Sequence, residues 1–293
     1  MQPSNLKYRI AGMLILAISF AACTKTDNPN NLPAVSPNDY VGKVDGYTSS
    51  DEVYPGNIIA QWTFDENKNE KLTGTAPTST LNDALVDGGI RGKALSLNAG
   101  YLYYAVQFPK FKADSLKNFT VSMWTKIANN GSKRTMLFEL ARPGIFYGSL
   151  NIIANTNQAT TITTLKLQPL FTTAGGGTQD NLNATINPTI GLDKWTHIVV
   201  TYNSTTGIFN EWADGVNIGS YSSRGTAAGN LFKSWEPGEL IIGSNYNGIP
   251  GKTVSTDVSF APMTGQIDEI RVYNIALPDA NIRALYNLGK VNK

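Results

Sequence analysis

Reactive side chains are scarce in this sequence. Its 293 residues include one histidine, His197, and one cysteine, Cys23. Nucleophilic sites of the Ser–His–Asp or Cys–His type need an imidazole as general base, and His197 lies inside an apolar segment that predicts a buried strand. The sequence therefore predicts no catalytic residues of this kind, and we expect His197 to be structural.

Runs of basic residues are also absent. The chain has 24 lysines and arginines against 22 aspartates and glutamates. Two of the basic residues, Lys7 and Arg9, lie in the first 22 residues, which contain no acid, so the remaining chain has no net formal charge. Nucleic acids and anionic membrane faces attract basic surfaces, and neither is predicted as a partner.

The first 22 residues have the pattern of a secretory signal. Lys7 and Arg9 precede an apolar run over residues 10–22, and about thirteen apolar residues are too few to cross a bilayer as a helix. Cys23 follows directly and, as the only cysteine, cannot form an internal disulfide. The segment Phe-Ala-Ala-Cys over residues 20–23 resembles the lipobox of bacterial lipoproteins, with Phe20 where that motif usually has leucine.

This resemblance implies a signal peptide over residues 1–22 and acylation of Cys23. The protein would then be anchored in the outer membrane, on the periplasmic side or at the cell surface, and would contact the membrane only through its lipid. An ordinary signal peptide that leaves a free thiol is the alternative. Residues 23–56 are rich in Asn, Pro, Ser, Asp and Gly, bury too little apolar surface to fold, and are interpreted as a flexible tether.

Residues 57–293 read as one all-β domain. Thr, Ile, Val, Tyr and Phe are plentiful, and Asn and Gly separate short apolar runs. Residues 119–127 alternate between two faces, and residues 195–202 are apolar on both, as in a strand buried inside a sandwich. The other expected strands cover residues 58–64, 94–106 (as two short strands around 98–100), 134–140, 145–153, 160–171, 208–213, 216–221, 239–242 and 266–273.

Two local signals complete this prediction. Asp214-Gly215, between two expected strands, favours a hairpin with a type I′ turn. One helix is expected, with Pro278 in its first turn and Gly289 at its end. Many short strands followed by a single late helix predict an antiparallel sandwich rather than a βαβ fold.

Three segments, in this order, resemble the laminin-G-like (LamG), concanavalin A-like jelly-roll family. They are WTHIVVTY (195–202), FNEWADG (209–215) and TGQIDEIRVYNIAL (264–277), and residues 62–65 and 92–97 fit the first strands of the family. The resemblance implies a two-sheet antiparallel jelly-roll sandwich over residues 57–293 with one short C-terminal helix. It says little about function, because this fold carries lectins, adhesins, glycosidases and inert spacers.

Glycoside hydrolysis is the enzymatic alternative. Retaining glucanases of this fold carry two carboxylates about 5–5.5 Å apart, placed at alternate positions of one strand so that they share a face. No two acidic residues of this sequence are separated by one position. A hydrolase or lyase is therefore disfavoured, although carboxylates from different strands remain open. Loss of activity on changing Asp268 or Glu211 to the amide would favour it.

A structural Ca²⁺ is implied by the same resemblance, since members of the family often bind one. Asp65 and Asp268 lie at the acidic positions of the first and last strands, which are neighbours in a jelly roll. Calcium prefers carboxylate and carbonyl oxygens as ligands. Acids that accept hydrogen bonds from backbone groups in turns are an equal alternative.

Aromatic residues outside the expected strands are the candidate ligand contacts. A sugar packs its C–H face on Trp or Tyr, whose tips stay polar. Trp235 and Tyr246 lie in turn-rich segments, and Tyr147 and Tyr101 are weaker candidates near strand ends. The other tryptophans lie in expected strands and are assigned to the core: Trp62, Trp124, Trp195 and Trp212.

Together these features predict a non-catalytic envelope lipoprotein that binds carbohydrate or another extracellular polymer, for glycan capture or adhesion. Two alternatives stay open. One is a glycoside hydrolase or lyase of the same fold. The other is a protein-interaction module of an outer-membrane complex, most simply through an exposed sheet edge.

Overall fold

A computed structural model describes residues 41–112, 116–129, 131–155, 163–172, 179–222 and 236–293, with the backbone alone for residues 179–181. The chain divides into two compact units, residues 1–41 and residues 42–293. All elements named below belong to the second unit. Two residues singled out in the sequence, Cys23 and Trp235, lie outside the described residues.

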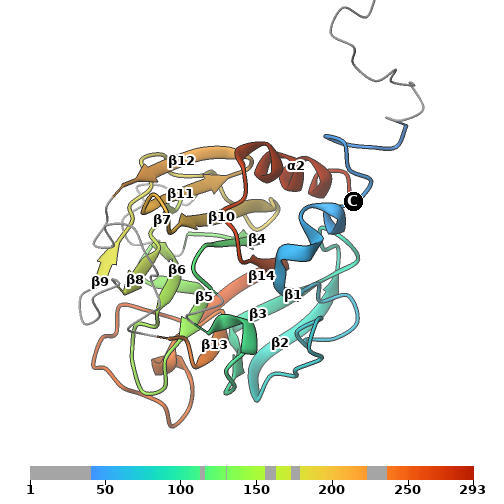
Figure 1. Cartoon of the computed structure of the whole chain (residues 1–293). Coiled ribbons are helices and arrows are strands. Elements are labelled where there is room, and N and C mark those ends of the chain that lie inside the picture. The colour runs from blue at the N-terminus through green and yellow to red at the C-terminus, as the bar shows by residue number, and fades with distance from the viewer. Residues whose placement is uncertain (1–40, 113–115, 130, 156–162, 173–178, 223–235) are drawn as a thin grey trace, which may run out of the picture. The chain divides into compact units, whose positions relative to one another are not determined.

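The unit 42–293 is built on antiparallel strands that form one curled sheet of the jelly-roll type (Figure 1). This confirms the all-β architecture that the sequence predicts. The strands pair in the order β12-β11-β10-β4-β14-β3-β13-β5-β6-β8-β9, with β1 beside β14, β2 beside β3 and β7 beside β6. Their bounds are β1 Ile58–Trp62, β2 Ser79–Asp87, β3 Lys93–Tyr104, β4 Phe119–Ile127, β5 Arg134–Ala141, β6 Leu150–Asn155, β7 Lys166–Leu167, β8 Leu170–Thr172, β9 Gln179–Asn181, β10 Thr196–Asn203, β11 Ile208–Ala213, β12 Val216–Tyr221, β13 Glu239–Ile242 and β14 Met263–Tyr273.

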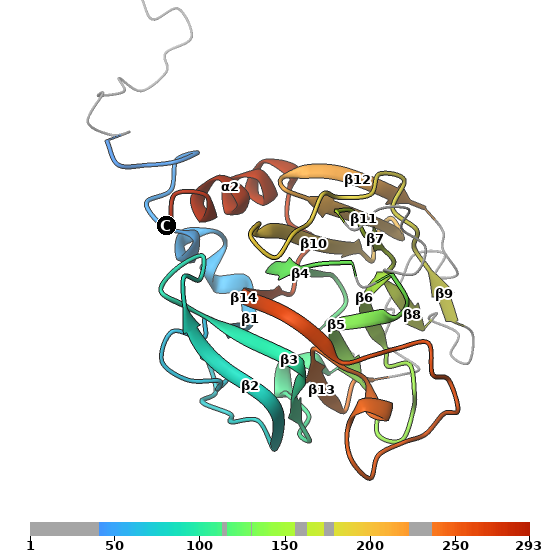
Figure 2. The same ribbon diagram turned by 180° about the vertical axis from the view of Figure 1, so that it is seen from behind.

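Strand β3 carries the sheet around its curl (Figure 2). Its first part, up to Gly100, pairs with β14, and its last residues, from Leu102 onward, pair with β13. Ala99, at the change of partner, has a φ of 50°. The prediction of two strands around residues 98–100 was therefore wrong in number: one strand runs through, and it is irregular where it exchanges one neighbour for another.

The main core lies between the facing parts of the curled sheet. Phe119, Val121 and Met123 of β4 belong to it together with Ile198 and Val200 of β10, as the alternation in the sequence predicts. Full burial of one such side chain contributes about 1.5–3 kcal/mol. The two strands with the clearest pattern therefore contribute directly to the packing of this core.

The hairpin of β11 and β12 turns at Asp214-Gly215, as predicted. The two residues have φ angles of 48° and 74°, and a type I′ turn needs a positive φ at both positions. A side chain at position 215 would also come within 3.0 Å of the Tyr286 ring. Glycine is required there both by the backbone conformation and by the space beside the helix.

Helix α2 (Asp279–Gly289) covers the outer face of the sheet with a second apolar layer (Figure 1). It follows Pro278 and ends at Gly289, as predicted. Within the described residues no helix is long and apolar enough to cross a membrane. The side chains of this second layer include Ile282, Leu285 and Leu288 from the helix and Val199, Trp212 and Tyr273 from the sheet.

Part of the stretch interpreted as a flexible tether belongs to the packed unit, which begins at residue 42. Val53 is fully buried in the apolar layer under α2. Two 3₁₀ turns shape the segment, η2 (Ser50–Glu52) and η3 (Pro55–Asn57). Composition did not reveal this docking because, among the described residues 41–56, Val53 is the one fully buried apolar residue and most of its neighbours are polar.

Ion pairs hold the same segment against the sheet. The Asp51 carboxylate accepts hydrogen bonds from Arg91 at 3.0 Å and Arg271 at 2.9 Å, and both arginines also pair with Glu269, at 2.9 and 2.5 Å. Burial alone would raise the pKa of Asp51, but the hydrogen bonds from the two arginines hold that pKa well below its usual range. Each charge in the network has an opposite partner, as burial requires.

Candidate functional site

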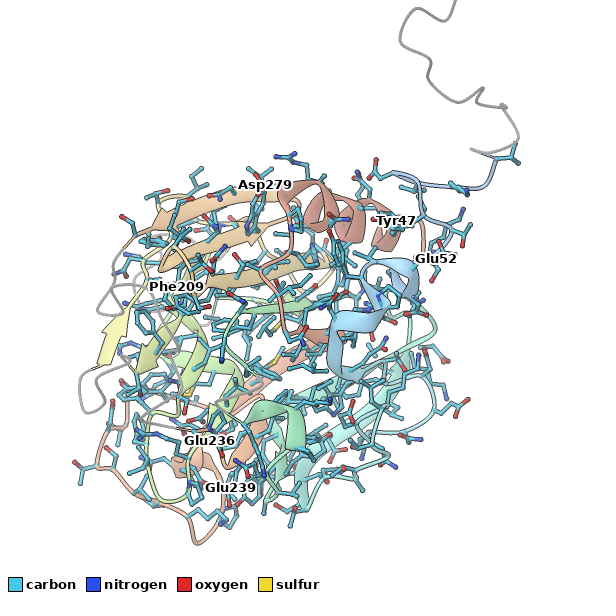
Figure 3. The ribbon with its side chains drawn as sticks, in the orientation of Figure 1. Tyr47, Glu52, Phe209, Glu236, Glu239 and Asp279 are labelled. Carbon is cyan, nitrogen blue, oxygen red and sulfur yellow. The ribbon has the colours of Figure 1, made fainter. Side chains whose placement is uncertain are left out.

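Three of the four aromatic residues predicted as ligand contacts lie around one face of the sheet, the outer face of β3, β13 and β5. Tyr101 and Tyr246 belong to a small apolar cluster there with Tyr103, and Tyr147 lies in the loop that follows β5. Glu239 begins β13 at the end of the unit remote from Asp279, the first residue of α2 (Figure 3).

Tyr101 and Tyr246 are buried rather than displayed. Their exposed fractions are 3% and 1%. The Tyr246 ring packs edge-on against Tyr103, with 6.2 Å between the ring centroids, and the ammonium group of Lys252 lies 4.9 Å from the Tyr103 centroid. A sugar platform needs an exposed ring face, and these two rings offer none. The glycines and amides beside Tyr246 suggested a surface loop, but the turn η5 (Tyr246–Gly248) folds the ring inward.

Tyr147 belongs to an aromatic cluster at the edge of this face. The loop 142–149 and the loop 243–262 lie side by side there (Figures 1 and 2). Tyr147 is 6.0 Å from Phe260 by ring centroids, and the Arg134 guanidinium lies over the Phe260 ring at 5.5 Å. The rings of the cluster are those of Phe146, Tyr147 and Phe260.

A cavity of about 310 Å³ opens beside this cluster, within the loop between β13 and β14, and is called the loop-end pocket below. Small-molecule sites occupy about 300–1,000 Å³, so this volume suits a compact ligand. The lining combines amides, hydroxyls, one carboxylate and one aromatic ring: Asn245, Asn247, Gly248, Thr253, Ser255, Thr256, Asp257, Val258, Phe260 and Pro262.

Two asparagines of the loop-end pocket differ in what their amides do. The Asn247 amide makes all its hydrogen bonds within the loop. Its Nδ2 donates to the carbonyls of Ser255 at 2.7 Å and Asp257 at 3.3 Å. Its Oδ1 accepts from the N–H groups of Val254 and Ser255 at 3.0 and 3.1 Å. Asn245 is 4% exposed, and its Nδ2 has no hydrogen-bond partner among the described residues. A buried donor without a partner is costly, which makes Asn245 a candidate ligand contact.

The Asp257 carboxylate is the acceptor of the pocket. Hydrogen bonds from the side chain and N–H of Ser259, the latter at 2.7 Å, lower its pKa, and Arg134 acts in the same direction. The carboxylate is therefore ionised at neutral pH. The loop-end pocket thus offers an unpaired amide donor, a charged acceptor and the ring of Phe260, the groups that sugar hydroxyls and a sugar C–H face require.

Two carboxylates from neighbouring strands also share this outer face. Glu139 of β5 lies opposite Ile241 of β13, and Glu239 of β13 lies opposite Ala141 of β5, so the two acids are diagonal neighbours. Glu139 is fully buried, and burial raises its pKa well above the usual value, with a further contribution from Glu239. Its Oε1 accepts from the N–H of Gly148 at 2.8 Å. Glu139 thus fastens the loop 142–149 and presents no surface to a substrate.

The two acids predicted as calcium ligands both hold the turn between β2 and β3. Asp65 accepts from the N–H of Lys93 at 3.1 Å. Asp268 accepts from the N–H groups of Ile90 and Glu269 at 2.7 and 2.8 Å, one on each oxygen, and is fully buried. Calcium takes six to eight oxygen ligands, typically. Among the described residues no three acids, histidines or cysteines gather as a metal site, so these two residues do not fit a calcium site by themselves, and the ion stays a prediction.

The residues considered for catalysis are sealed in the interior. His197 is 1% exposed, its Nε2 lies 2.8 Å from the Ser122 hydroxyl, and burial lowers its pKa to about 3. Its ring stacks on Trp124 at 4.8 Å. Glu211 and Asp268, the carboxylates considered for hydrolysis, are both fully buried. Access from solvent, which any of these roles needs, is absent at these positions.

Sequence reasoning missed Phe260 and Asn245 of the loop-end pocket. A usable signal was the length of their loop: 20 residues separate Ile242 from Met263. Loops longer than about 12–15 residues are uncommon in compact domains and are often functional. The sequence did not predict that Glu139 and Glu239 are neighbours either, because their proximity depends on the register between two strands that are far apart in sequence.

The family model described as the concanavalin A-like lectin/glucanases superfamily (Laminin_G_3) matches residues 100–283. The match covers more than half of the chain, and the protein belongs to this superfamily. No curated protein sequence is similar enough to count as a relative.

Two solved binding domains show the same fold at low sequence identity, and a third solved domain aligns with a lower TM-score. The binding domain of paraclostridial mosquitocidal protein 1 aligns with a TM-score of 0.53 at 15% identity, over 79% of this chain and 52% of that chain. The binding domain of botulinum neurotoxin DC in complex with SialylT aligns with a TM-score of 0.53 at 11% identity, over 80% of this chain and 52% of that chain. Domain 4 of AbnA, an arabinanase from Geobacillus stearothermophilus, in complex with arabinotriose, aligns with a TM-score of 0.48 at 18% identity. The alignment covers 78% of this chain and 98% of that chain. The chain thus spans about half the length of the two toxin domains.

Proposed function

We propose that this protein is a non-catalytic carbohydrate-binding module that holds its ligand in the loop-end pocket. One observation carries the proposal: the buried, unpartnered Nδ2 of Asn245, the ionised carboxylate of Asp257 and the ring of Phe260 line the same cavity. Sugar recognition needs a donor, an acceptor and an aromatic surface in one place. Membership of a superfamily that includes lectins supports the same class of ligand.

Retardation of the protein in gels that contain polysaccharides is the test. The full chain, purified in detergent, is run against gels of different neutral and charged polymers, with Ca²⁺ and with a chelator. Asn245→Ala and Phe260→Ala are expected to lose the retardation, because each removes one of the recognition groups. Thr73→Ala, a change in the loop between β1 and β2, is the control that should bind as the native chain does.

A polymer that binds the native chain and both pocket variants equally would overturn the loop-end pocket as the site. No binding to any polymer would overturn the carbohydrate class and favour the protein-interaction alternative. The same samples, assayed for new reducing ends, test whether the protein cleaves what it binds. We expect none, because the acids considered for hydrolysis are buried.

The proposal includes the membrane anchor and location predicted from the sequence: acylation of Cys23 and attachment to the outer membrane through that lipid. Cys23 is preceded by an apolar run with small residues at its end. Mass spectrometry of the protein from a membrane fraction is expected to find two or three acyl chains on Cys23, and Cys23→Ser to release the protein from the membrane. An unmodified thiol at this position would overturn the anchor.

A further inference from the structure

A second cavity, of about 480 Å³, lies where helix α2 ends. We call it the lysine–tryptophan cavity. Its walls come from β4, from the residues just before β10, from the turn between β2 and β3 and from the C-terminal end of α2. It shares no lining residue with the loop-end pocket. The residues that carry the argument are Trp124, Lys126, Trp195, Tyr286 and Lys290.

The aromatic wall of this cavity is fixed from several sides. Trp195, which the sequence assigned to the core, is half-buried and lines the cavity, since β10 begins one residue later. Its Nε1 donates to the carbonyl of Gly88 at 3.2 Å, which sets the orientation of the indole. Trp124 and Tyr286 stack with 5.8 Å between centroids and 17° between planes. A side chain at Gly289 would come within 2.3 Å of Trp124, so the helix must end in glycine for the stack to form.

The charge in the cavity is positive. Lys126 holds its ammonium group 4.8 Å from the centroid of the Trp195 ring, and Lys290 holds its own 5.4 Å from that of Tyr286. Lys194 is neutralised by Asp214 at 2.9 Å. Among the described residues neither Lys126 nor Lys290 pairs with a carboxylate. The C-terminal end of α2 carries a partial negative charge, which is smaller than the two full charges of these lysines.

We propose that the lysine–tryptophan cavity binds a carboxylated sugar unit, with its carboxylate between Lys126 and Lys290 and its C–H face against Trp195. A small inorganic anion would use the lysines but not the rings, and a neutral sugar would use the rings but leave both lysines unpaired. A sugar acid uses both, and charge-assisted hydrogen bonds are roughly twice as strong as neutral ones. The inference does not depend on the loop-end pocket.

Isothermal titration of the full chain with trigalacturonate and with its methyl ester tests this site, because the ester keeps the sugar ring and removes the charge. The acid is expected to bind at least roughly tenfold more tightly than the ester, a factor that about 1.4 kcal/mol supplies. Lys126→Gln/Lys290→Gln should remove that preference, whereas Lys71→Gln/Lys110→Gln, which changes the net charge equally at two exposed positions, should keep it.

Three results would overturn the proposal. Equal affinity for the acid and the ester would show that charge is not recognised. Equal losses in both double-lysine variants would show attraction to the whole protein rather than to this cavity. Sulfate competing as strongly as trigalacturonate, with Trp195→Phe and Trp195→Ala both binding like the native chain, would indicate an unspecific anion site. Circular dichroism of the tryptophan variants confirms folding, and the lysine variants decide the question if either tryptophan variant fails to fold.

Discussion

Single side chains on the outer face of β3, β13 and β5 are held by contacts that their sequence neighbours do not reveal. Tyr246 stands among glycines and amides, yet it is buried against Tyr103. Glu139 stands in a strand-forming run, yet it fastens a loop through the N–H of Gly148. Residue type and position alone made Tyr246, Tyr147 and Tyr101 candidate ligand contacts, without placing them on one face. Which rings are exposed depends on how the loop after β13 folds back, and no local pattern encodes that.

Glu139 leads to a prediction about pH. The folded protein keeps a proton on this buried carboxyl well above the ordinary value of 4.5, whereas the unfolded chain releases it near that value. The free energy of unfolding should therefore fall as the pH rises above 4.5, by up to about 1.4 kcal/mol per pH unit for one proton. Asp268, whose pKa burial raises to about 8, contributes a slope of the same sign. In Glu139→Gln, the free energy of unfolding should therefore fall less steeply as the pH rises.

Urea unfolding at pH 5, 6.5 and 8 measures this slope. Glu66→Gln, which removes an exposed carboxylate, is the matched control and should decline with pH as the native protein does. Identical curves for Glu139→Gln and the native protein would contradict a protonated Glu139 in the folded state.

The elements that the sequence predicts best are those whose apolar residues recur at a regular spacing. Strands β4 and β10 pack one face into the main core, and the alternation of their side chains records it. Strand β2 (Ser79–Asp87) was not predicted, because it has no fully buried residue and pairs only with β3. The hairpin at Asp214-Gly215 was found because the conformation of its turn restricts which residues fit.

The loop 243–262 behaves as an element whose shape depends on one amide. Asn247 makes four hydrogen bonds across it. Asn247→Ala should therefore loosen the loop and weaken ligand binding, while global stability changes by less than about 1–2 kcal/mol because the core is untouched. Hydrogen exchange at the amides of Val254 and Ser255 should speed up in this variant. It should stay native in Asn245→Ala, and equal exchange in both variants would refute the assignment.

The whole unit depends on contacts between segments far apart in sequence. Residues 42–57 dock through the Asp51 carboxylate, which joins Arg91 and Arg271. Local composition suggests disorder there, since the partners lie 40 and 220 residues away. This explains why the boundary of the domain, unlike its class, was misplaced by the sequence pattern.

Asp51→Asn tests that docking. The Asp51 pKa is lowered in the folded state from an ordinary 3.8, so its stabilisation is complete above about pH 4 and is lost as the pH falls further. At pH 6 the variant should be less stable by about 1–2 kcal/mol, since the carboxylate is partly exposed. Near pH 3 the difference between variant and native protein should shrink. Urea unfolding at both pH values measures this, and a constant difference would contradict the network as its source.

The docked segment also decides how the unit responds to pulling. Residues 42–57 lie against β14 and α2: the Asn57 side chain donates to Asn274, β1 pairs with β14, and the Lys293 side chain reaches the carbonyl of Gly42. A force that enters at residue 42 and leaves through a ligand in the loop-end pocket would load the hydrogen bonds of β1 and β14 together along the strands rather than open them one at a time. The contact between Lys293 and Gly42 would be loaded first, because it lies where the force enters. A protein tethered at one end and holding a polymer at the other would thus bear traction along β1 and β14.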